Sequence, residues 1–342
     1  MDKDLKYFKE LLFKSQLPDH DFLFNLAEKC SVIMETEFTD YRPPSDSGIP
    51  GGVLDYRNSS LPLVVVPDIH ARPKFVYNIL KYPLTEDFLG TDKSYTVLEA
   101  LDKKLINLVC VGDALHSEHS SIIRWFAIST EFKFGITTGT AMTEEMKDGL
   151  NTICSLMELK CLYPENFQFL KGNHENIMNK SSEGDYGFRK YADEGKMVRT
   201  FITDYYGDDV LYILSCVEYD MPLIFVNQNC VISHAEPKKG FTKNQLINAR
   251  ADGTVVEGLT WTDNDAAEDG SVELVIKNLA EMNDIENYVY LGGHRPVSGL
   301  YKLRQNGKYI QFHNPGEQHV ALVKNGQKFD PDFDLVDVDT EY

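Results

Sequence analysis

Short apolar runs alternate along the chain with longer stretches whose apolar residues recur at helical spacing. The runs are strand-sized and rich in Val, Ile, Leu and Phe, and they lie at residues 61–67, 106–112, 166–171, 222–234 (two runs) and 288–293. Alternation of this kind is typical of an α/β protein with a mostly parallel or mixed sheet.

The N-terminal part is predicted to be helical. Apolar residues recur at helical spacing over residues 3–35 and are interrupted at Pro18, which indicates two short helices. Residues 41–54 are rich in Pro, Gly and Ser, as in a surface loop or linker. We therefore assign residues 1–60 to a helical extension with its linker.

The C-terminal part is predicted to be rich in strands. Asn306-Gly307 and Asn325-Gly326 each lie between β-rich runs, a strong hairpin signal. The stretch 329–342 is acidic, which favours a solvated tail; a second interpretation is that it occupies a metal site as an autoinhibitor. This leaves residues 61–328 as the main domain.

Composition narrows the function classes. The 342 residues contain 34 Lys and Arg against 53 Asp and Glu, a formal charge of −19, which argues against binding to a nucleic-acid polymer or an anionic membrane. No apolar run is long enough to cross a bilayer, and the first residues, MDKDLKYFKE, lack the basic start and apolar stretch of a secretory signal, so we expect none. The six cysteines form no CxxC pair, so we expect a reducing, cytoplasmic setting.

Polar residues of the kinds that bind metals follow five of the apolar runs directly. In chain order, the clusters hold Asp68 and His70, Asp113 and His116, Asn173 and His174, His234, and His294. Ligand sites of open α/β sheets lie beyond the carboxyl ends of the strands, so these loops are expected to converge.

The residue types constrain the metal. Carboxylates, imidazoles and one amide, with no thiolate, suit manganese, iron or zinc. Six ligands are too many for one catalytic ion that keeps an open position, whereas two divalent ions about 3.5 to 4 Å apart use all six. Such ions also supply the positive charge that a phosphate needs in an acidic protein.

The ordered motifs DxH, GD, GNHE, SH and GH resemble those of the calcineurin-like metallophosphoesterase superfamily. The surrounding sequence is most similar to the serine/threonine phosphoprotein phosphatase branch, through LYPENFQFLKGNHE (162–175), LTWTDND (259–265) and HNPGEQHVALV (313–323). The resemblance covers roughly residues 61–325 and implies a four-layer α/β/β/α sandwich with two mixed β-sheets.

The resemblance also implies roles for individual residues. Asp68 and His70 would bind the first metal and Asp113 would bridge both ions, which makes it part of the reaction. The second metal would be held by Asn173, His234 and His294. A hydroxide shared by the ions would attack phosphorus while His174 protonates the leaving oxygen.

Two departures concern the phosphate grip. Where the phosphatases have an aspartate and an arginine after the bridging aspartate, this chain has His116 and Ser117. His116 is either a catalytic partner of His174 or a structural cap. Arg72 and Arg295, each close in sequence to a metal ligand, are the candidate substrate-binding replacements.

A third departure is extra chain around residues 120–160, which predicts a helical insertion beside the site, as a lid or a specificity wall. The function expected from all these features is hydrolysis of phosphate monoesters, with phosphoserine or phosphothreonine in proteins among the substrates. One alternative is cleavage of nucleotide anhydrides such as diadenosine polyphosphates, since relatives with that activity share an ending like GGHRPVSG. The other is a catalytically weak, metal-binding interaction protein.

Overall fold

The computed structural model describes residues 3–118, 122–282 and 285–339. Within these ranges most strands belong to two large sheets. The six-stranded sheet runs, in spatial order, β1 (Val53–Asp55), β7 (Ile224–Val226), β8 (Cys230–Ser233), β9 (Val289–Gly292), β11 (Tyr309–Gln311) and β10 (Lys302–Arg304). The five-stranded sheet runs β13 (Leu335–Asp337), β12 (His319–Val323), β2 (Leu63–Val66), β5 (Asn107–Cys110) and β6 (Phe167–Phe169).

The two sheets share one hydrophobic core. Val65 and Val109 of the five-stranded sheet and Phe225, Ile232 and Leu291 of the six-stranded sheet are fully buried in the same cluster. Both sheets are mixed: β2, β5 and β6 pair in parallel, as do β8, β9 and β11, while β7 is antiparallel to β8 and β12 is antiparallel to β2. The sheets therefore pack face to face.

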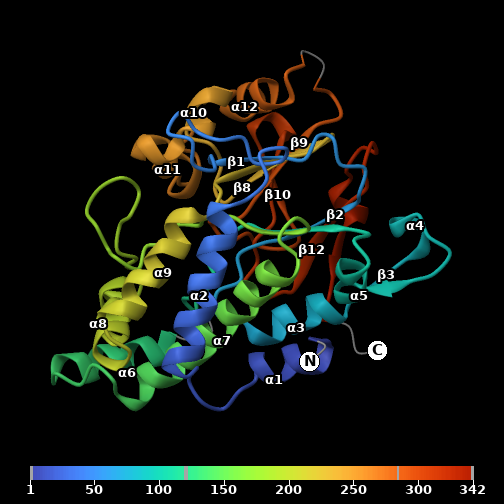
Figure 1. Ribbon diagram of the computed structural model, residues 1–342. Helices are drawn as coiled ribbons and strands as arrows, with labels where there is room; N and C mark the ends of the chain where they lie inside the picture. The colour runs from blue at the N-terminus through green and yellow to red at the C-terminus, as the bar shows by residue number, and fades with distance from the viewer. Residues whose placement is uncertain (1–2, 119–121, 283–284, 340–342) are drawn as a thin grey trace.

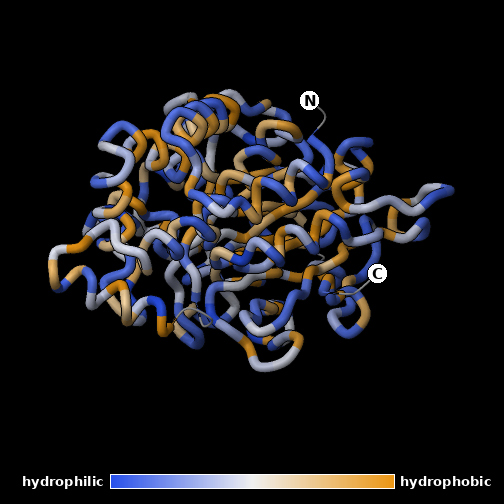
Figure 2. Tube along the Cα trace, turned by 90° about the horizontal axis from the view of Figure 1, so that it is seen from below, coloured by the Kyte–Doolittle hydropathy of each residue, from blue (hydrophilic) through white to orange (hydrophobic). Residues whose placement is uncertain are grey.

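Helices cover both outer faces (Figures 1 and 2). Those packed in the core on the five-stranded sheet are α1 (Leu5–Leu12), α2 (His20–Glu35), α3 (Pro73–Lys81), α4 (Glu86–Leu89), α5 (Val97–Asp102), α6 (Ile122–Lys133), α7 (Thr140–Leu162), α8 (Glu194–Tyr205) and α9 (Asp208–Asp220). The six-stranded sheet is covered by α10 (Lys243–Ile247), α11 (Gly253–Thr260) and α12 (Ser271–Ala280). The predicted four-layer α/β/β/α sandwich is thus confirmed.

The N-terminal segment is integral to this architecture. The break at Pro18 separates α1 from α2, as predicted, and both helices pack against α7. The proposed linker is not only a loop, because it contributes β1, which pairs in parallel with β7. The six-stranded sheet thus draws on chain before the expected boundary at residue 61.

The C-terminal segment also differs from a solvated tail. The Asn306-Gly307 hairpin is present, since β10 and β11 pair antiparallel on either side of it. Residues 335–337 of the acidic stretch form β13, which pairs with β12 after the short helix α13 (Pro331–Asp334). Residues 340–342, at the end of the proposed tail, lie outside the described ranges.

The described part of the 120–160 insertion consists of α6 and α7. Helix α7 is the crossover between the parallel strands β5 and β6, and its C-terminal half is almost wholly buried against α1, α2 and β6. This half is therefore a core helix rather than a lid. None of the described helices has both the length and the apolarity required to traverse a bilayer.

Candidate metal centre

The strands that precede the five motifs all end at one place. Parallel pairing aligns the carboxyl ends of β2, β5 and β6 in one sheet and those of β8, β9 and β11 in the other. In the second sheet Gly292 pairs with Gln311, so His294 and His313 each lie two residues beyond a paired position. The motif loops meet where the sheets adjoin, as the sequence predicted.

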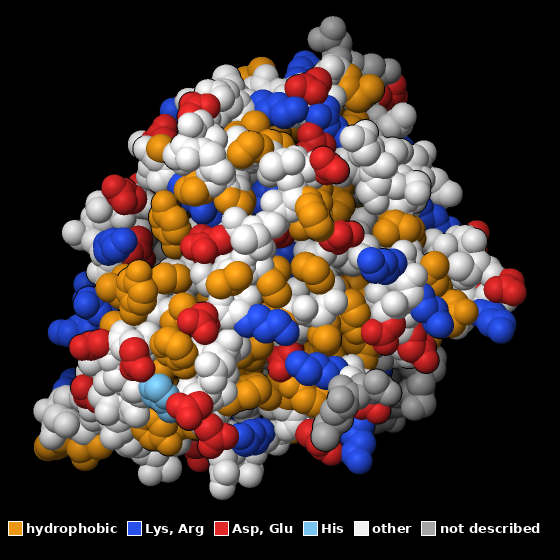
Figure 3. All heavy atoms as spheres, in the orientation of Figure 1, with side chains coloured by type: hydrophobic (Ala, Val, Ile, Leu, Met, Phe, Trp, Pro, Cys, Tyr) orange, Lys and Arg blue, Asp and Glu red, His pale blue; other side chains and the backbone are white. Residues whose placement is uncertain are grey.

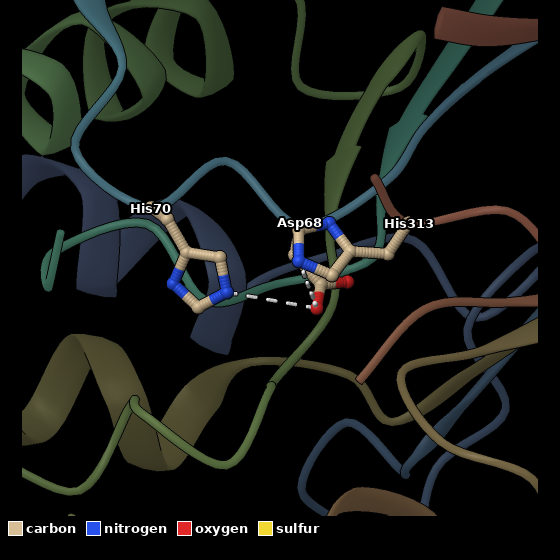
Figure 4. Close-up of side chains that lie close together, drawn as sticks. All are labelled: Asp68, His70 and His313. Atoms are coloured by element: carbon tan, nitrogen blue, oxygen red, sulfur yellow. Dashed lines mark ion pairs between the residues drawn. The ribbon is translucent and has the colours of Figure 1, made fainter. Parts of the chain in front are cut away.

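Asp68 is the centre of a first group of side chains (Figure 4). Its Oδ2 lies 3.7 Å from Nε2 of His70 and 3.8 Å from Nε2 of His313. Oε2 of Glu118 lies 3.7 Å from the same nitrogen of His70 and 3.5 Å from that of His313. These four atoms have no hydrogen-bond partner among the described residues, although all are buried.

Asp113 lies between this group and a second one. Its Oδ2 is 3.8 Å from Nε2 of His70, 3.7 Å from Nε2 of His174 and 3.4 Å from Nε2 of His234. This oxygen too finds no hydrogen-bond partner in the described part of the chain. Its position between the groups is the one expected of a shared carboxylate.

The second group is built on the side chain of Asn173. Its Oδ1 is 2.9 Å from Nε2 of His234 and 3.0 Å from Nδ1 of His294. Nδ1 of His234 lies 3.1 Å from the carbonyl oxygen of Val111 and donates to it in the neutral imidazole. Nε2 of His234 is then an acceptor that faces two further acceptors, the oxygens of Asn173 and Asp113. A cation between these atoms would make this arrangement favourable.

Close backbone approach explains two of the motif glycines. A β-carbon at Gly172 would overlap Oδ1 of Asp113, and one at Gly293 would overlap Oδ1 of Asp68. Backbone strain is also concentrated here, because Asp113 and His294 have φ values of 55° and 65°. Left-handed conformations of residues other than glycine cluster at functional sites.

The carboxylate of Glu175, in the GNHE motif, holds two loops together. It accepts hydrogen bonds from the backbone amides of Asp113, Ala114 and Gly172 at 2.7 to 2.9 Å. Burial raises the pKa of Glu175, against the lowering effect of these amides. The motif thus fixes the loop after β5 to the loop after β6.

Burial shifts the pKa values of two clustered side chains, Asp113 and His174, in the direction that disfavours their charged forms. Burial, with the nearby carboxylates of Glu175 and Asp68, raises the pKa of Asp113 well above its usual range. Burial and the neighbouring imidazole of His70 lower the pKa of His174 well below its usual value. A cation among these groups would stabilise the carboxylates without protonating the imidazoles.

The donor set fits divalent metal ions. Buried oxygens and imidazole nitrogens converge from six strand ends, several of them without a partner in the described residues, and three groups of Asp and His have donor atoms within 4.8 Å of one another. Buried carboxylates without compensation are costly, so the cluster calls for a positive charge at its centre. The buried His/Asp cluster is compatible with a two-metal site.

His116 lies beside His174, as one of its two interpretations requires. Their ring centroids are 5.1 Å apart, and both ring nitrogens of His116 are buried without a partner in the described residues. Burial and His70 lower the pKa of His116 to about 3. The ring of Phe188 covers His174 at a centroid distance of 3.6 Å, which the sequence did not indicate.

The two candidate phosphate-binding arginines differ in their surroundings. The guanidinium of Arg72 donates to the backbone carbonyl oxygens of Asp68, Ile69 and Glu317 at 2.7 to 2.9 Å. Most of its donors are therefore used to hold the loop after β2. Arg295 is half-exposed and forms an ion pair with Asp263, so its guanidinium is accessible from solvent.

Glu118 and His313 were not predicted from the sequence to be site residues, although His313 follows a strand that could reach the site. A signal for His313 was available, because it follows the apolar run KYIQF just as the predicted ligands follow theirs. Glu118 follows no strand directly and reaches the cluster through the course of the loop after β5. Its position required the structure.

Comparisons with known proteins support the fold. No family model and no curated protein matches the sequence. A solved protein serine/threonine phosphatase from Saccharomyces cerevisiae, similar to human phosphatase PP5, superposes with a TM-score of 0.56 at 14% identity, over 97% of this chain and 94% of that one. A cold-active protein-tyrosine phosphatase of a psychrophilic Shewanella gives 0.42 at 13% identity over 80% and 77%, too loose a match to carry an argument.

The chain has the calcineurin-like metallophosphoesterase fold. This confirms at the level of the fold the resemblance that the five motifs indicated. At 14% identity the likeness does not extend to activity, which has to be argued from the site.

Proposed function

We propose that this protein is a two-metal phosphoesterase that hydrolyses phosphate monoesters, with phosphoserine or phosphothreonine in proteins as candidate substrates. The observation that carries the proposal is the convergence of buried Asp, His and Asn donors beyond the carboxyl ends of six strands, several of them without a hydrogen-bond partner in the described residues. Bound there, two divalent ions would activate a water molecule and neutralise the phosphate charge.

The remaining chemistry is assigned to this chain's own residues. Asp68 and His70 hold the first ion, and Asn173, His234 and His294 the second, with Asp113 shared between them. His174 donates the proton to the leaving oxygen, and His116, beside it, orients its ring.

Binding of the substrate phosphate is assigned to the guanidinium group of Arg295. Its partner Asp263 is an exposed side chain, so a doubly charged phosphate competes well for the guanidinium. Arg72, which binds three backbone carbonyls, holds the Asp68 loop in place. Arg295→Ala is therefore expected to raise KM, whereas Arg72→Ala is expected to lower both kcat and thermal stability.

The experiment is metal-dependent phosphate release from p-nitrophenyl phosphate, phosphopeptides and diadenosine polyphosphates, with manganese, iron or zinc. The parent is compared with His174→Ala and with His20→Ala, a matched control at a histidine whose side chain is 43% exposed. We expect His174→Ala to lose about 10²- to 10⁴-fold in kcat on monoesters, as is usual for general acids. The control should match the parent.

Each outcome selects one function. Turnover of phosphopeptides supports a protein phosphatase in a cytoplasmic setting, whereas turnover of the dinucleotides alone supports the anhydride hydrolase suggested by GGHRPVSG. Two bound metals without hydrolysis of any substrate would leave the interaction protein as the answer.

A further inference from the structure

The first metal position has more donors than the motifs account for. The motif residues supply Asp68, His70 and the shared Asp113. Nε2 of His313 and Oε2 of Glu118 face the same space and, like their neighbours, have no hydrogen-bond partner in the described ranges. Both side chains are at least nine-tenths buried.

The four outer donors form a closed ring of alternating nitrogen and oxygen. In order around the ring, the edges are His70–Asp68 at 3.7 Å, Asp68–His313 at 3.8 Å, His313–Glu118 at 3.5 Å and Glu118–His70 at 3.7 Å. The donors of Asp68, His70 and His313 all lie within 4.8 Å of one another. The four side chains thus surround one small space.

Such a ring matches the coordination of one ion. Two nitrogen or oxygen donors that bind one ion at about 2.0 to 2.2 Å each can lie at most about 4.0 to 4.4 Å apart. All four edges are shorter than this limit, so each neighbouring pair of donors can share an ion. Charge agrees as well, because two carboxylates and two neutral imidazoles form a net anionic site that a divalent cation neutralises.

The surroundings orient these donors toward the centre. Nδ1 of His70 lies 3.1 Å from the carbonyl oxygen of His116 and donates to it, so Nε2 is the free acceptor. The other oxygen of Glu118 receives the ammonium group of Lys190. Lys190 thus fixes the carboxylate without occupying the oxygen that faces the ring.

We propose that Glu118 and His313 are ligands of the first metal ion, completing with Asp68 and His70 a four-donor site that Asp113 links to the second ion. This inference rests on the proposed two-metal function and deepens it. The first position then binds metal more tightly than the second, and Lys190 is a positioning residue for it.

The test measures metal content and affinity, not turnover. Purified parent, Glu118→Gln, His313→Ala and Lys190→Met are stripped, reloaded with manganese or zinc, dialysed and measured by elemental analysis and calorimetry. Glu10→Gln and His20→Ala, both at exposed positions, are the matched controls. Circular dichroism of the stripped proteins checks folding, and Glu118→Asp replaces any variant that does not fold.

We expect two ions per chain in the parent and controls, and loss of the tighter one in Glu118→Gln and His313→Ala. Lys190→Met should keep two ions but weaken the tighter by about 10- to 100-fold, the usual effect of removing a residue that orients a ligand. Anomalous diffraction of the loaded parent should place an ion within about 2.6 Å of both Glu118 and His313.

Other results overturn the inference. Two ions with unchanged affinity in both ligand variants, or an ion remote from these side chains, would show that the ring serves another purpose. A parent that binds no metal would overturn both this inference and the proposed function. Two bound ions without phosphate release would overturn the proposed function alone.

Discussion

At the scale of single residues, close packing at the site decides which side chain a position can carry. A β-carbon at Gly293 would overlap the carboxylate of Asp68, the central side chain of the first donor group. The glycine in the GH motif is thus a packing requirement set by a residue 225 positions earlier in the printed sequence. Its role becomes apparent only when the two sheets are together.

Gly293→Ala is expected to displace Asp68, lowering the free energy of unfolding by about 1 to 3 kcal/mol as overpacking does. Metal content should fall as well. Gly316→Ala is the control, because its β-carbon would meet only Oδ1 of Asn314, at 3.4 Å. Urea unfolding and elemental analysis measure both effects; equal values for the two variants would contradict the argument.

Glu218 offers a test of pH dependence away from the metal cluster. It is buried, and Oε2 accepts a hydrogen bond from the amide of Ile177 at 2.8 Å. Burial, helped by Glu175 and Asp185, raises its pKa to about 8. The folded state therefore holds a proton that the unfolded chain releases near pH 4.5, so stability is lost as the pH rises from there through 8.

Glu218→Gln removes this titration while retaining an acceptor for Ile177. We expect the variant to gain stability over the parent as the pH rises, by on the order of a few kcal/mol above pH 8, with little difference below pH 4.5. Urea unfolding at pH 4, 7 and 9 measures the change. A difference between the two proteins that stays constant with pH would refute the assignment.

At the scale of elements, the sequence predicted the strands that are marked by their own apolar residues. The apolar runs became β2, β5, β6, β7, β8 and β9, because each lies in a continuous apolar stretch of sequence that shows its burial directly. Strands β1 and β13 were missed. Each has three residues in a segment whose composition suggests a loop or an acidic tail, and each exists through pairing with a distant strand.

The site likewise contains residues that the sequence predicted and residues that only the structure revealed. Five motifs were visible because each directly follows a strand that could be recognised, and the structure brings all six predicted ligands together. Glu118 was not visible, because its position depends on how the loop after β5 folds against α6 and α7. There Ser117 donates its backbone amide to Glu145 of α7 at 2.9 Å.

Strand β13 gives the acidic stretch a structural role that can be measured. Leu335 is buried and pairs with Ala321, whereas Asp332 lies on the surface. Leu335→Ala should cost about 2 to 4 kcal/mol, the usual loss for a buried leucine, and Asp332→Asn about 0.5 kcal/mol or less. If both variants show equally small effects in thermal unfolding, the acidic stretch is a solvated tail, as the sequence suggested.

On the scale of the whole molecule, the net negative charge means that any binding of phosphate has to rely on local positive charge. Acidic, basic and apolar side chains are intermixed on the face shown in Figure 3, where the described residues form no extended patch of Lys and Arg. With a formal charge of −19, long-range attraction of a phosphorylated substrate is weak. Metal ions bound at the junction of the sheets, as proposed, would provide the missing positive charge.

The same ions would join the two halves of the fold. Asp68 and Asp113 follow strands of the five-stranded sheet, while His234, His294 and His313 follow strands of the six-stranded sheet. A cation between them binds the folded chain only, so it stabilises by about 2.7 kcal/mol at a hundred times its Kd. For a chain of 342 residues, that corresponds to a rise in Tm of about 4 °C.

Removing metal with a chelator is therefore expected to lower Tm by this amount, and adding manganese or zinc back should restore it. Asp68→Asn is the control variant, because it removes the carboxylate at the centre of the first donor group and should respond less to the chelator than the parent does. Scanning calorimetry at fixed pH measures both. An ion bound across the two sheets must raise the Tm, because it binds the folded chain only. If the chelator changes the Tm of neither the parent nor the variant, the junction of the sheets is held by protein contacts alone.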